Sequence, residues 1–436
     1  MKDFKYHLSI TNCRAIQSAE IDLSEITVLA GVNASGKSTI ARMFRDLVEL
    51  SAEYERLLAV QMWNGRMDMW RYFVTGGMRV PMRGARPLYK IQEDLASGKM
   101  VFSDAVSMLE RTLQEYVTQN ANNYRADLFA QRARRILDIR EESIDLVDCF
   151  RKEAARVLEK FEQRRNTRSY SAYQELLHGN ALDEGEIVLT EGGRVVFSNQ
   201  GGRRDKLDEV SFIKRAIYIE SPFKSFPKVI TSTELRMDDA YSRVKENVSP
   251  ESVFRLLDFE KVISGDFTLE TNLDDGEDPE VRALLGRGAR WMYRRKDGSS
   301  FAWEECATGI KALSILSVLH SQGWLDSETL LIIDEPEAHL HPQWIVEYAR
   351  ILLQLSRILR VRIIVTSHSP DMVNAIHTIG TAIGMGDELG FYLAEENETV
   401  PFKFNYKGLG NKVGPIFKAY NTSFKRIDDY ARQGGL

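Results

Sequence analysis

The chain has 436 residues, of which 43% are hydrophobic and 28% are charged, and its formal net charge is −5. This composition is typical of a globular protein, and the length allows a large core in two or three structural units. The negative net charge argues against a basic field over the whole protein that would attract nucleic acid. The three cysteines lie far apart, which argues against a disulfide scaffold or zinc site and fits a reducing cytoplasm. No apolar run is long enough to span a bilayer, so we expect a soluble, cytoplasmic protein without a membrane partner.

The first strands lead into a glycine-rich loop. Short strands are expected at residues 6–10, 20–23 and 26–30. Residues 31–38 read GVNASGKS and fit the P-loop pattern G-x-x-x-x-G-K-[ST] in full. A helix with one apolar face is expected from Lys37 onward, which supplies the strand–loop–helix context that a P-loop requires.

The P-loop pattern predicts a nucleotide site. Backbone N–H groups of such a loop, together with the helix N-terminus, cradle phosphates. Lys37 is expected to reach the β- and γ-phosphates, and the Ser38 hydroxyl is expected to be a ligand of Mg²⁺. The nucleotide-binding residues predicted here are Gly31, Asn33, Ala34, Ser35, Gly36, Lys37, Ser38 and Thr39.

Residues 45–180 are expected to be mostly helical and highly charged. Apolar residues recur at helical spacing from Phe150 to Phe161, among many Arg and Lys residues. Because Asp and Glu are mixed with them, a solvated charged face is favoured over a nucleic-acid surface, which stays an alternative. We therefore divide the chain into residues 1–84 and 181–436, two parts of one nucleotide-binding head, and residues 85–180, an inserted charged helical region.

Further strands and hairpins are expected after the helical region. Hairpins are predicted at residues 186–198, around Gly192-Gly193, and at residues 291–303, around Asp297-Gly298. The other predicted strands are residues 216–220, 330–333, 361–366, 390–394 and 401–406. The apolar run at 330–333 ends at Asp334 and Glu335, where open α/β sheets bind ligands.

Four motifs occur in an order that resembles the ABC-type ATPases of the SMC, RecF and OLD kind. They are residues 31–38, 307–311, 330–340 and 366–370. The phrase DEPEAHLHP, which begins at Asp334, is typical of compact prokaryotic ABC ATPases in OLD nucleases and phage-defence systems. The resemblance implies an α/β fold, namely an ABC-type P-loop ATPase head with a mixed or parallel sheet core, an inserted helical region and β-hairpins.

The resemblance also implies roles for particular residues. Asp334 would hold Mg²⁺, directly or through water, and Glu335 would be the catalytic group that polarises the attacking water. His368 would be a second catalytic residue, in contact with the γ-phosphate of ATP. The further nucleotide-binding residues that the resemblance implies are Arg14, Thr308, Gly309 and Lys311.

The same resemblance implies an assembly. Gly309 begins a helix whose N-terminus would face the ATP of an opposite protomer, so a head-to-tail homodimer or higher homo-oligomer is expected. The spacing of His339 and His341 would suit a metal pair, although packing and contacts across the interface are favoured. A glutamine-bearing loop is not evident, and Glu220-Ser221 is the best positional candidate for its role.

We expect an ATPase subunit of a prokaryotic defence system. It resembles the ATPases of Septu- and PARIS-type systems, which act with a separately encoded effector, often a nuclease or toxin, and a phage-derived trigger is compatible with this expectation. The alternative is a RecF- or SMC-like DNA-binding repair ATPase. The divergent signature argues against an ABC transporter subunit, and the short tail after His368 leaves too little room for an OLD-type nuclease domain.

Overall fold

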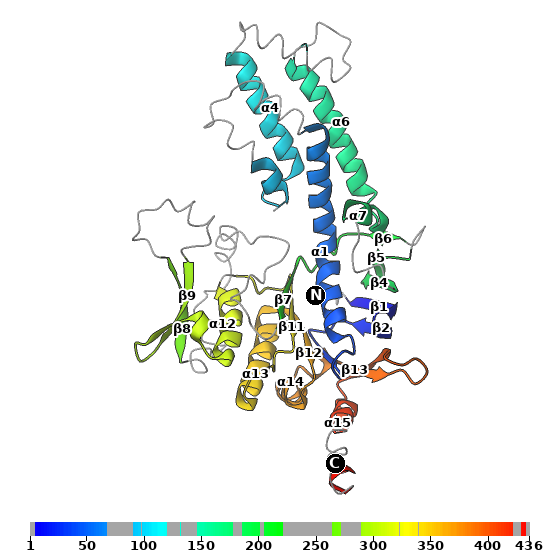
Figure 1. Ribbon diagram of the computed structural model, residues 1–436, viewed down its shortest axis with the longest axis vertical. Helices are drawn as coiled ribbons and strands as arrows, with labels where there is room; N and C mark the ends of the chain where they lie inside the picture. Colours follow the sequence, from blue (N-terminus) through cyan, green and yellow to red (C-terminus); the bar gives the residue numbers. More distant parts are fainter. Residues whose placement is uncertain are drawn as a thin grey trace.

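A computed structural model describes most of the chain. The described residues are 5–67, 90–96, 98–119, 131, 146–177, 185–200, 205–220, 264–271, 289–321, 323–338, 340–421 and 429–432. They form a head built on a large sheet, from which a helical arm projects (Figure 1). The described helices lack the length and apolar character that a membrane-spanning segment needs.

The head is organised around a mixed sheet. Among the described residues, eleven strands follow the order β6-β5-β4-β1-β2-β14-β13-β3-β12-β11-β7. The parallel centre consists of β13 (Leu389–Glu396), β3 (Ile26–Ala30), β12 (Arg362–Ser367), β11 (Thr329–Asp334) and β7 (Arg215–Glu220). The remaining strands are β1 (Tyr6–Cys13), β2 (Ile16–Asp22), β4 (Glu186–Glu191), β5 (Arg194–Ser198), β6 (Lys206–Leu207) and β14 (Phe404–Gly410).

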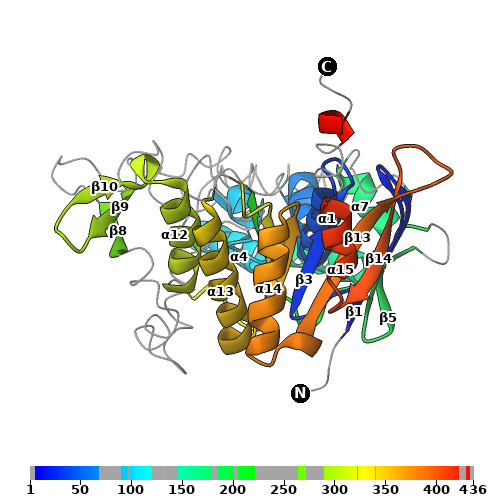
Figure 2. The same ribbon diagram turned by 90° about the horizontal axis from the view of Figure 1, so that it is seen from below.

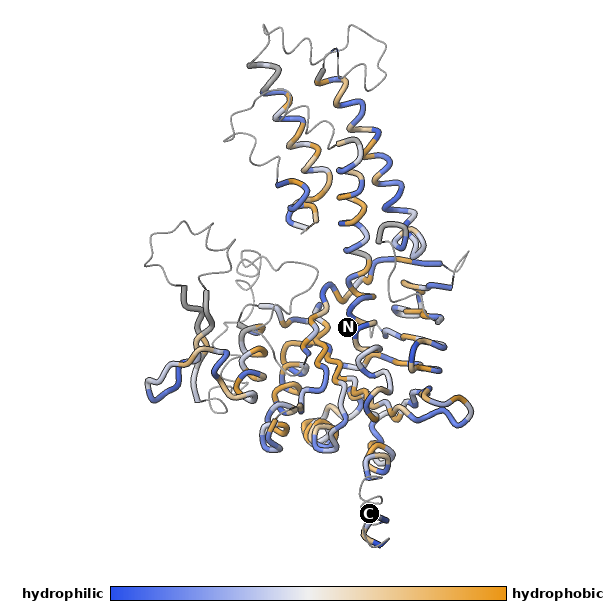
Figure 3. Tube along the Cα trace, viewed as in Figure 1, coloured by the Kyte–Doolittle hydropathy of each residue, from blue (hydrophilic) through white to orange (hydrophobic). Residues whose placement is uncertain are grey.

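Alternate residues of the central strands enter two separate cores. Leu330 and Ile332 belong to the same core as Phe44 of α1 (Lys37–Met62), whereas Leu331 and Ile333 face the opposite core. Since successive side chains of a strand point to opposite faces, a strand covered on both sides must be apolar throughout. Figure 3 shows hydrophobic residues concentrated on these central strands.

Helices cover both faces of the sheet. Helix α1 packs on one face, and the second core contains residues of the helices on the other. The helices on that second face are α12 (Thr308–Ser321), α13 (Pro342–Leu359), α14 (Pro370–Ala382) and the short α15 (Gly414–Tyr420), which contacts α14. Figure 2 shows α12, α13 and α14 side by side.

Most predicted strands are confirmed, with three differences. The short β6, which pairs with β5, was not predicted. The second hairpin consists of β9 (Ala289–Arg295) and β10 (Ser300–Ala302), but a third strand that we did not predict, β8 (Gly265–Thr271), pairs with β9. The expected strand at 401–406 is wrong in its first half, because β14 begins only at Phe404. Phe402 has a left-handed φ of 61°, and the chain turns there before it enters the strand.

The arm is held together by an apolar seam. It consists of the outer part of α1, α4 (Phe102–Gln119) and α6 (Leu146–Asn166), as Figure 1 shows. Phe102 stacks on Phe161 with ring centroids 4.8 Å apart, and Leu109 and Phe150 are fully buried. Burying such a side chain contributes about 1.5–3 kcal/mol, against about 0.2–1 kcal/mol for an exposed ion pair. The seam therefore outweighs the surrounding charges.

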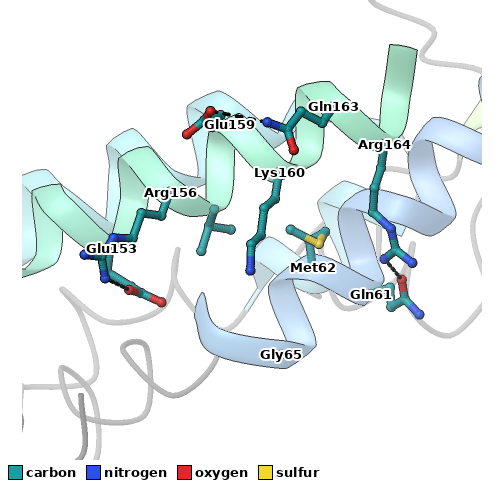
Figure 4. A pocket seen from close by; sticks show the side chains of 10 residues that line it. Gln61, Met62, Gly65, Glu153, Arg156, Glu159, Lys160, Gln163 and Arg164 are labelled. Carbon is teal, nitrogen blue, oxygen red and sulfur yellow. Dashed lines mark hydrogen bonds and ion pairs between the residues drawn. The ribbon is translucent and has the colours of Figure 1, made fainter. Parts of the chain in front are cut away.

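Several charged residues in the part of the arm that the structure describes pair with one another. Arg151 Nε lies 2.7 Å from Glu110 Oε1, and Arg165 Nε lies 3.0 Å from Glu55 Oε1, which links α6 to α4 and α1. A pocket of about 720 Å³ lies between α1 and α6, and on its wall Arg164 donates to Gln61 over 2.9 Å (Figure 4). These pairings favour the prediction of a solvated charged face.

Candidate active site

Three loops meet at the carboxyl edge of the central strands. Strand β3 ends at Ala30 and enters the P-loop, β11 ends at Asp334, and β12 ends at Ser367. In the parallel register, Asp334 lies opposite Thr366 and Ala30 lies opposite Ser367. The sheet thus brings together, at one edge, residues that are about three hundred positions apart in the sequence.

The P-loop has the tight geometry that its glycines permit. Gly36 has a left-handed φ of 98°, and a Cβ there would lie 2.8 Å from Ile16 Cγ1 at the start of β2. Arg14 lies in the turn between β1 and β2, two residues before Ile16. Asn33 and Ala34 are exposed on the loop, whereas Ser35 is buried.

Lys37 is almost fully buried beneath the loop. Its Nζ donates to the carbonyl oxygens of Gly31 over 3.0 Å and Val32 over 2.9 Å. Burial lowers the pKa of Lys37, while the nearby carboxylates of Glu335 and Asp334 act in the opposite direction. The ammonium group is therefore held where it can exchange these neutral carbonyls for phosphate oxygens, which are stronger acceptors.

The Asp334 carboxylate accepts hydrogen bonds from three hydroxyl groups. Ser38 Oγ donates to Oδ1 over 2.9 Å, Thr366 Oγ1 donates to the same oxygen, and the Tyr218 hydroxyl donates to Oδ2 over 2.6 Å. Burial, with the charge of Asp334, raises the pKa of Tyr218, so that its hydroxyl stays a donor. Sequence reasoning missed Tyr218, because the apolar pattern of β7 identified this position only as core.

Glu335 has an unusual backbone that orients its side chain. Its φ is 51°, and its N–H donates to Thr366 Oγ1 over 3.0 Å and to the Thr366 carbonyl over 3.1 Å. Its Oε1 lies 3.9 Å from Lys37 Nζ and 3.4 Å from His368 Nδ1. A non-glycine residue in this region costs about 1–3 kcal/mol, and such strain is concentrated at functional sites. The two distances show that Lys37, Glu335 and His368, which were predicted from separate motifs, lie together.

Glu337 holds the loop that carries His368. Its Oε1 accepts from Ser367 Oγ over 2.8 Å, from the His368 N–H over 2.8 Å and from the Ser369 N–H over 3.1 Å. Its side chain is only 4% exposed, and its Oε2 has no hydrogen-bond partner among the described residues. No local pattern in the sequence could show this role of Glu337, since its partners lie at a strand end thirty residues away.

Thr308, Gly309 and Lys311, the residues of the predicted signature motif, lie at the start of α12. Thr308 begins α12, and a Cβ on Gly309 would lie 2.9 Å from the Trp344 ring. Lys311 Nζ donates to the Glu304 carbonyl over 2.7 Å. Because α12 covers the face of the sheet opposite α1, the structure does not bring these residues to the P-loop of their own chain.

The predicted secondary candidates have simpler surroundings. His341 caps α13, where its Nδ1 accepts from the Gln343 N–H over 3.4 Å. Glu220 lies at the end of β7, 3.0 Å from an Arg42 nitrogen. His339 and Ser221 lie outside the described residues. Within the described ranges, no cluster of three or more His, Cys, Asp or Glu side chains is arranged to hold a metal ion.

Comparisons with solved structures find SMC heads. One is an SmcHead bound to the C-winged helix domain of ScpA, at 14% identity and TM-score 0.38, over 95% of this chain and 99% of that chain. Another is an Smc head with an extended coiled coil, derived from Pyrococcus furiosus, at 10% identity and TM-score 0.35, over 98% and 99%. A third is the SMC head domain from Thermotoga maritima, at 12% identity and TM-score 0.31, over 93% and 98%.

The family comparison is more decisive. No curated protein sequence matches the chain. The profile described as AAA ATPase domain matches residues 6–373. This range contains the P-loop, Asp334, Glu335 and His368, which the fold gathers at one sheet edge. Because the match covers well over half of its length, the chain belongs to the AAA ATPase domain family and is an ATPase with an α/β P-loop fold.

Proposed function

We propose that this ATPase is the Mg²⁺-dependent subunit of a prokaryotic anti-phage defence complex. In this proposal, ATP-dependent contacts between copies of the chain control a separately encoded effector such as a nuclease. The observation that supports the proposal is that α12 packs in the core on the face of the sheet opposite α1, the helix that begins in the P-loop. A nucleotide bound by one copy would meet the α12 N-terminus of another.

The residues at the strand ends fit a magnesium ion. Ser38 and Asp334 offer a hydroxyl and a carboxylate oxygen 2.9 Å apart, and Mg²⁺ prefers oxygen ligands from one or two side chains, with water and phosphate completing its shell. These two side chains would hold the ion, which would supply charge neutralisation at the phosphate oxygens. Tyr218 and Thr366 would fix the orientation of Asp334 through their hydrogen bonds.

The remaining polar residues suit an in-line attack on the γ-phosphate. Lys37 would bind the β- and γ-phosphates, and Glu335 would orient the attacking water and accept its proton. His368 lies 3.4 Å from Glu335 and would contact the γ-phosphate. Glu337 would keep His368 in place, because it accepts two backbone N–H groups of that loop.

The second half of the nucleotide site would come from another protomer. The first N–H groups of a helix and its dipole attract anions, and Thr308, Gly309 and Lys311 lie in the first turn of α12. We propose that this turn faces the γ-phosphate held by the opposite P-loop, with Arg14 near the same nucleotide. ATP would then favour a closed homodimer, and hydrolysis would release it.

The arm would transmit this change to a partner. Helix α1 begins in the P-loop and continues without interruption into the arm, so displacement of the P-loop would move the arm as well. We keep the proposed division into head residues 1–84 and 181–436 and an inserted region 85–180. An effector docked on that region would sense the nucleotide state. A phage-derived trigger would shift that nucleotide state.

Co-expression tests this function directly. The chain, produced with a nuclease or toxin encoded next to its gene, is expected to form a complex that survives purification and protects cells against phage. Lys37→Ala, which removes the phosphate-binding charge, is expected to abolish protection while leaving the complex intact. A chain that binds duplex DNA alone, in a salt-dependent manner, and restores DNA repair without any effector would support the RecF- or SMC-like alternative instead.

A further inference from the structure

The hydroxyl of Tyr420 joins two loops of the active site. It accepts a hydrogen bond from the Gly31 N–H over 3.2 Å and donates to the Ser367 carbonyl over 3.0 Å. Gly31 opens the P-loop, and Ser367 immediately precedes His368. A single atom at the end of helix α15 therefore bridges the loop that carries Lys37 and the loop that carries His368.

The position of this bridge within the sheet explains why it matters. Strands β3 and β12 pair in parallel up to Ala30 and Ser367, and beyond that pair the P-loop leaves the sheet. The Gly31 N–H and the Ser367 carbonyl thus lie where the backbone ladder stops, and buried backbone groups require partners. The Tyr420 hydroxyl supplies a partner to both groups, which extends the connection between the two strands by one step.

The surroundings keep the hydroxyl protonated and fixed. Burial raises the pKa of Tyr420 and outweighs the hydrogen bond from Gly31, which lowers it, while the charges of Glu337 and Glu335 raise it further, so the hydroxyl remains a donor at neutral pH. Helix α15 has only seven residues and would be marginal alone, but Val413 and Ile416 anchor it in the core. Helix α15 also contacts α14, which begins directly after the His368 loop.

We propose that Tyr420 is a positioning residue that keeps the P-loop and the His368 loop in register for hydrolysis, and that α15 responds to bound nucleotide through it. Tyr420 touches backbone atoms of both loops and acts on the chemistry only through them. A shift of Gly31 relative to Ser367 changes the position of Lys37 relative to His368. The bridge lies within one chain, so this proposal is independent of whether two copies share a nucleotide.

Three tyrosine variants isolate this role, because each removes one hydroxyl. Tyr420→Phe breaks the bridge, whereas Tyr406→Phe removes a 3.3 Å hydrogen bond to the Ser35 carbonyl, which involves the P-loop alone. Tyr348→Phe removes a buried hydroxyl that has no hydrogen-bond partner among the described residues. The three residues are thus a bridge, a contact to one loop and a neutral control.

Steady-state ATP hydrolysis provides the first measurement. Tyr420→Phe is expected to lower kcat about tenfold with a KM within about twofold of wild type, because misalignment affects the chemical step more than phosphate binding. Tyr406→Phe is expected to change KM more than kcat, and Tyr348→Phe to change neither. If Tyr420→Phe has the same kcat and KM as Tyr348→Phe, the proposal is overturned.

Hydrogen exchange provides a second measurement, and its first comparison does not need Tyr420→Phe. In Glu335→Gln, ATP is expected to slow amide exchange in residues 414–420. Adding Tyr420→Phe is expected to remove this protection without removing ATP binding. Exchange in α15 that is the same with and without saturating ATP would contradict the proposal, whatever the kinetics of Tyr420→Phe.

Discussion

Ser38 Oγ lies 2.9 Å from Asp334 Oδ1, although 296 positions separate the two residues in the sequence. The contact exists because β3 and β11 both flank β12 in parallel, so their carboxyl ends reach the same edge. It joins the residue that follows the P-loop lysine to the first acid of the buried strand. The proposed magnesium site depends on this pair.

Asp334→Asn tests that site. The amide keeps the shape of the side chain but loses the charge that a hard cation requires, so Mg²⁺-dependent ATP hydrolysis is expected to fall at least about a hundredfold. ATP binding, measured by calorimetry, should become nearly independent of Mg²⁺. Asp326→Asn is the matched control, because Asp326 pairs with Arg215 near the opposite end of β11. Wild-type magnesium dependence in Asp334→Asn would refute the assignment.

The sequence predicted the parts of this site that local patterns encode. The P-loop and the run before Asp334 each carry their own strand, loop or helix signal, and the structure confirms these elements. Tyr218, Glu337 and Tyr420 act through partners 116, 31 and 389 positions away, so no local pattern could reveal their bonds. Strand β8 was missed because its pairing with β9 depends on contacts across a long connection.

Glu335→Gln is expected to separate ATP binding from hydrolysis. Glutamine retains the size of the side chain but cannot accept the proton of the attacking water, so turnover should fall about a hundredfold or more while ATP affinity stays within a few-fold. Single-turnover measurements should then show ATP accumulating on the protein. Glu328→Gln, an exposed change just before β11, controls for charge. Equal hydrolysis rates in wild type and Glu335→Gln would exclude Glu335 as the base.

His7 predicts a pH-dependent contribution to stability. Burial lowers the pKa of His7, but hydrogen bonds to Asp22 and Glu20, both 2.8 Å long, outweigh it and raise the pKa above 6.5. The stabilisation is therefore complete below pH 6.5 and is lost as the pH rises through the folded-state value. His7→Gln should lower Tm relative to wild type at about pH 5.5 and have little effect at about pH 8.5.

The two carboxylates provide the control for this effect. In Asp22→Asn/Glu20→Gln, the charged form of His7 loses both partners, so replacing His7 should have the same effect on Tm at either pH. If the difference in Tm between wild type and His7→Gln is the same at every pH, packing rather than charge accounts for the contribution of His7.

The composite site predicts that ATP drives association. In Glu335→Gln, ATP should increase the molar mass measured by light scattering, and a carboxylate at the start of α12 should prevent the increase. Gly309 is a poor position for this test, because any side chain there meets the Trp344 ring at 2.9 Å. Thr308 is a better one, since it lies in the first turn without that obstruction.

Thr308→Asp has opposite effects on the helix and on the assembly. A carboxylate at a helix N-terminus stabilises the helix by about 0.3–1 kcal/mol, so α12 should form at least as well as in wild type. The same charge would repel a γ-phosphate presented by an opposite protomer. We therefore expect Glu335→Gln/Thr308→Asp to remain folded, with an unchanged or higher Tm, and to bind ATP without an increase in mass. Thr308→Asn, which is neutral and nearly isosteric with Asp, should associate normally. If the Asp and Asn variants both associate as Glu335→Gln does, the α12 N-terminus does not face a nucleotide, and the two copies do not share a site.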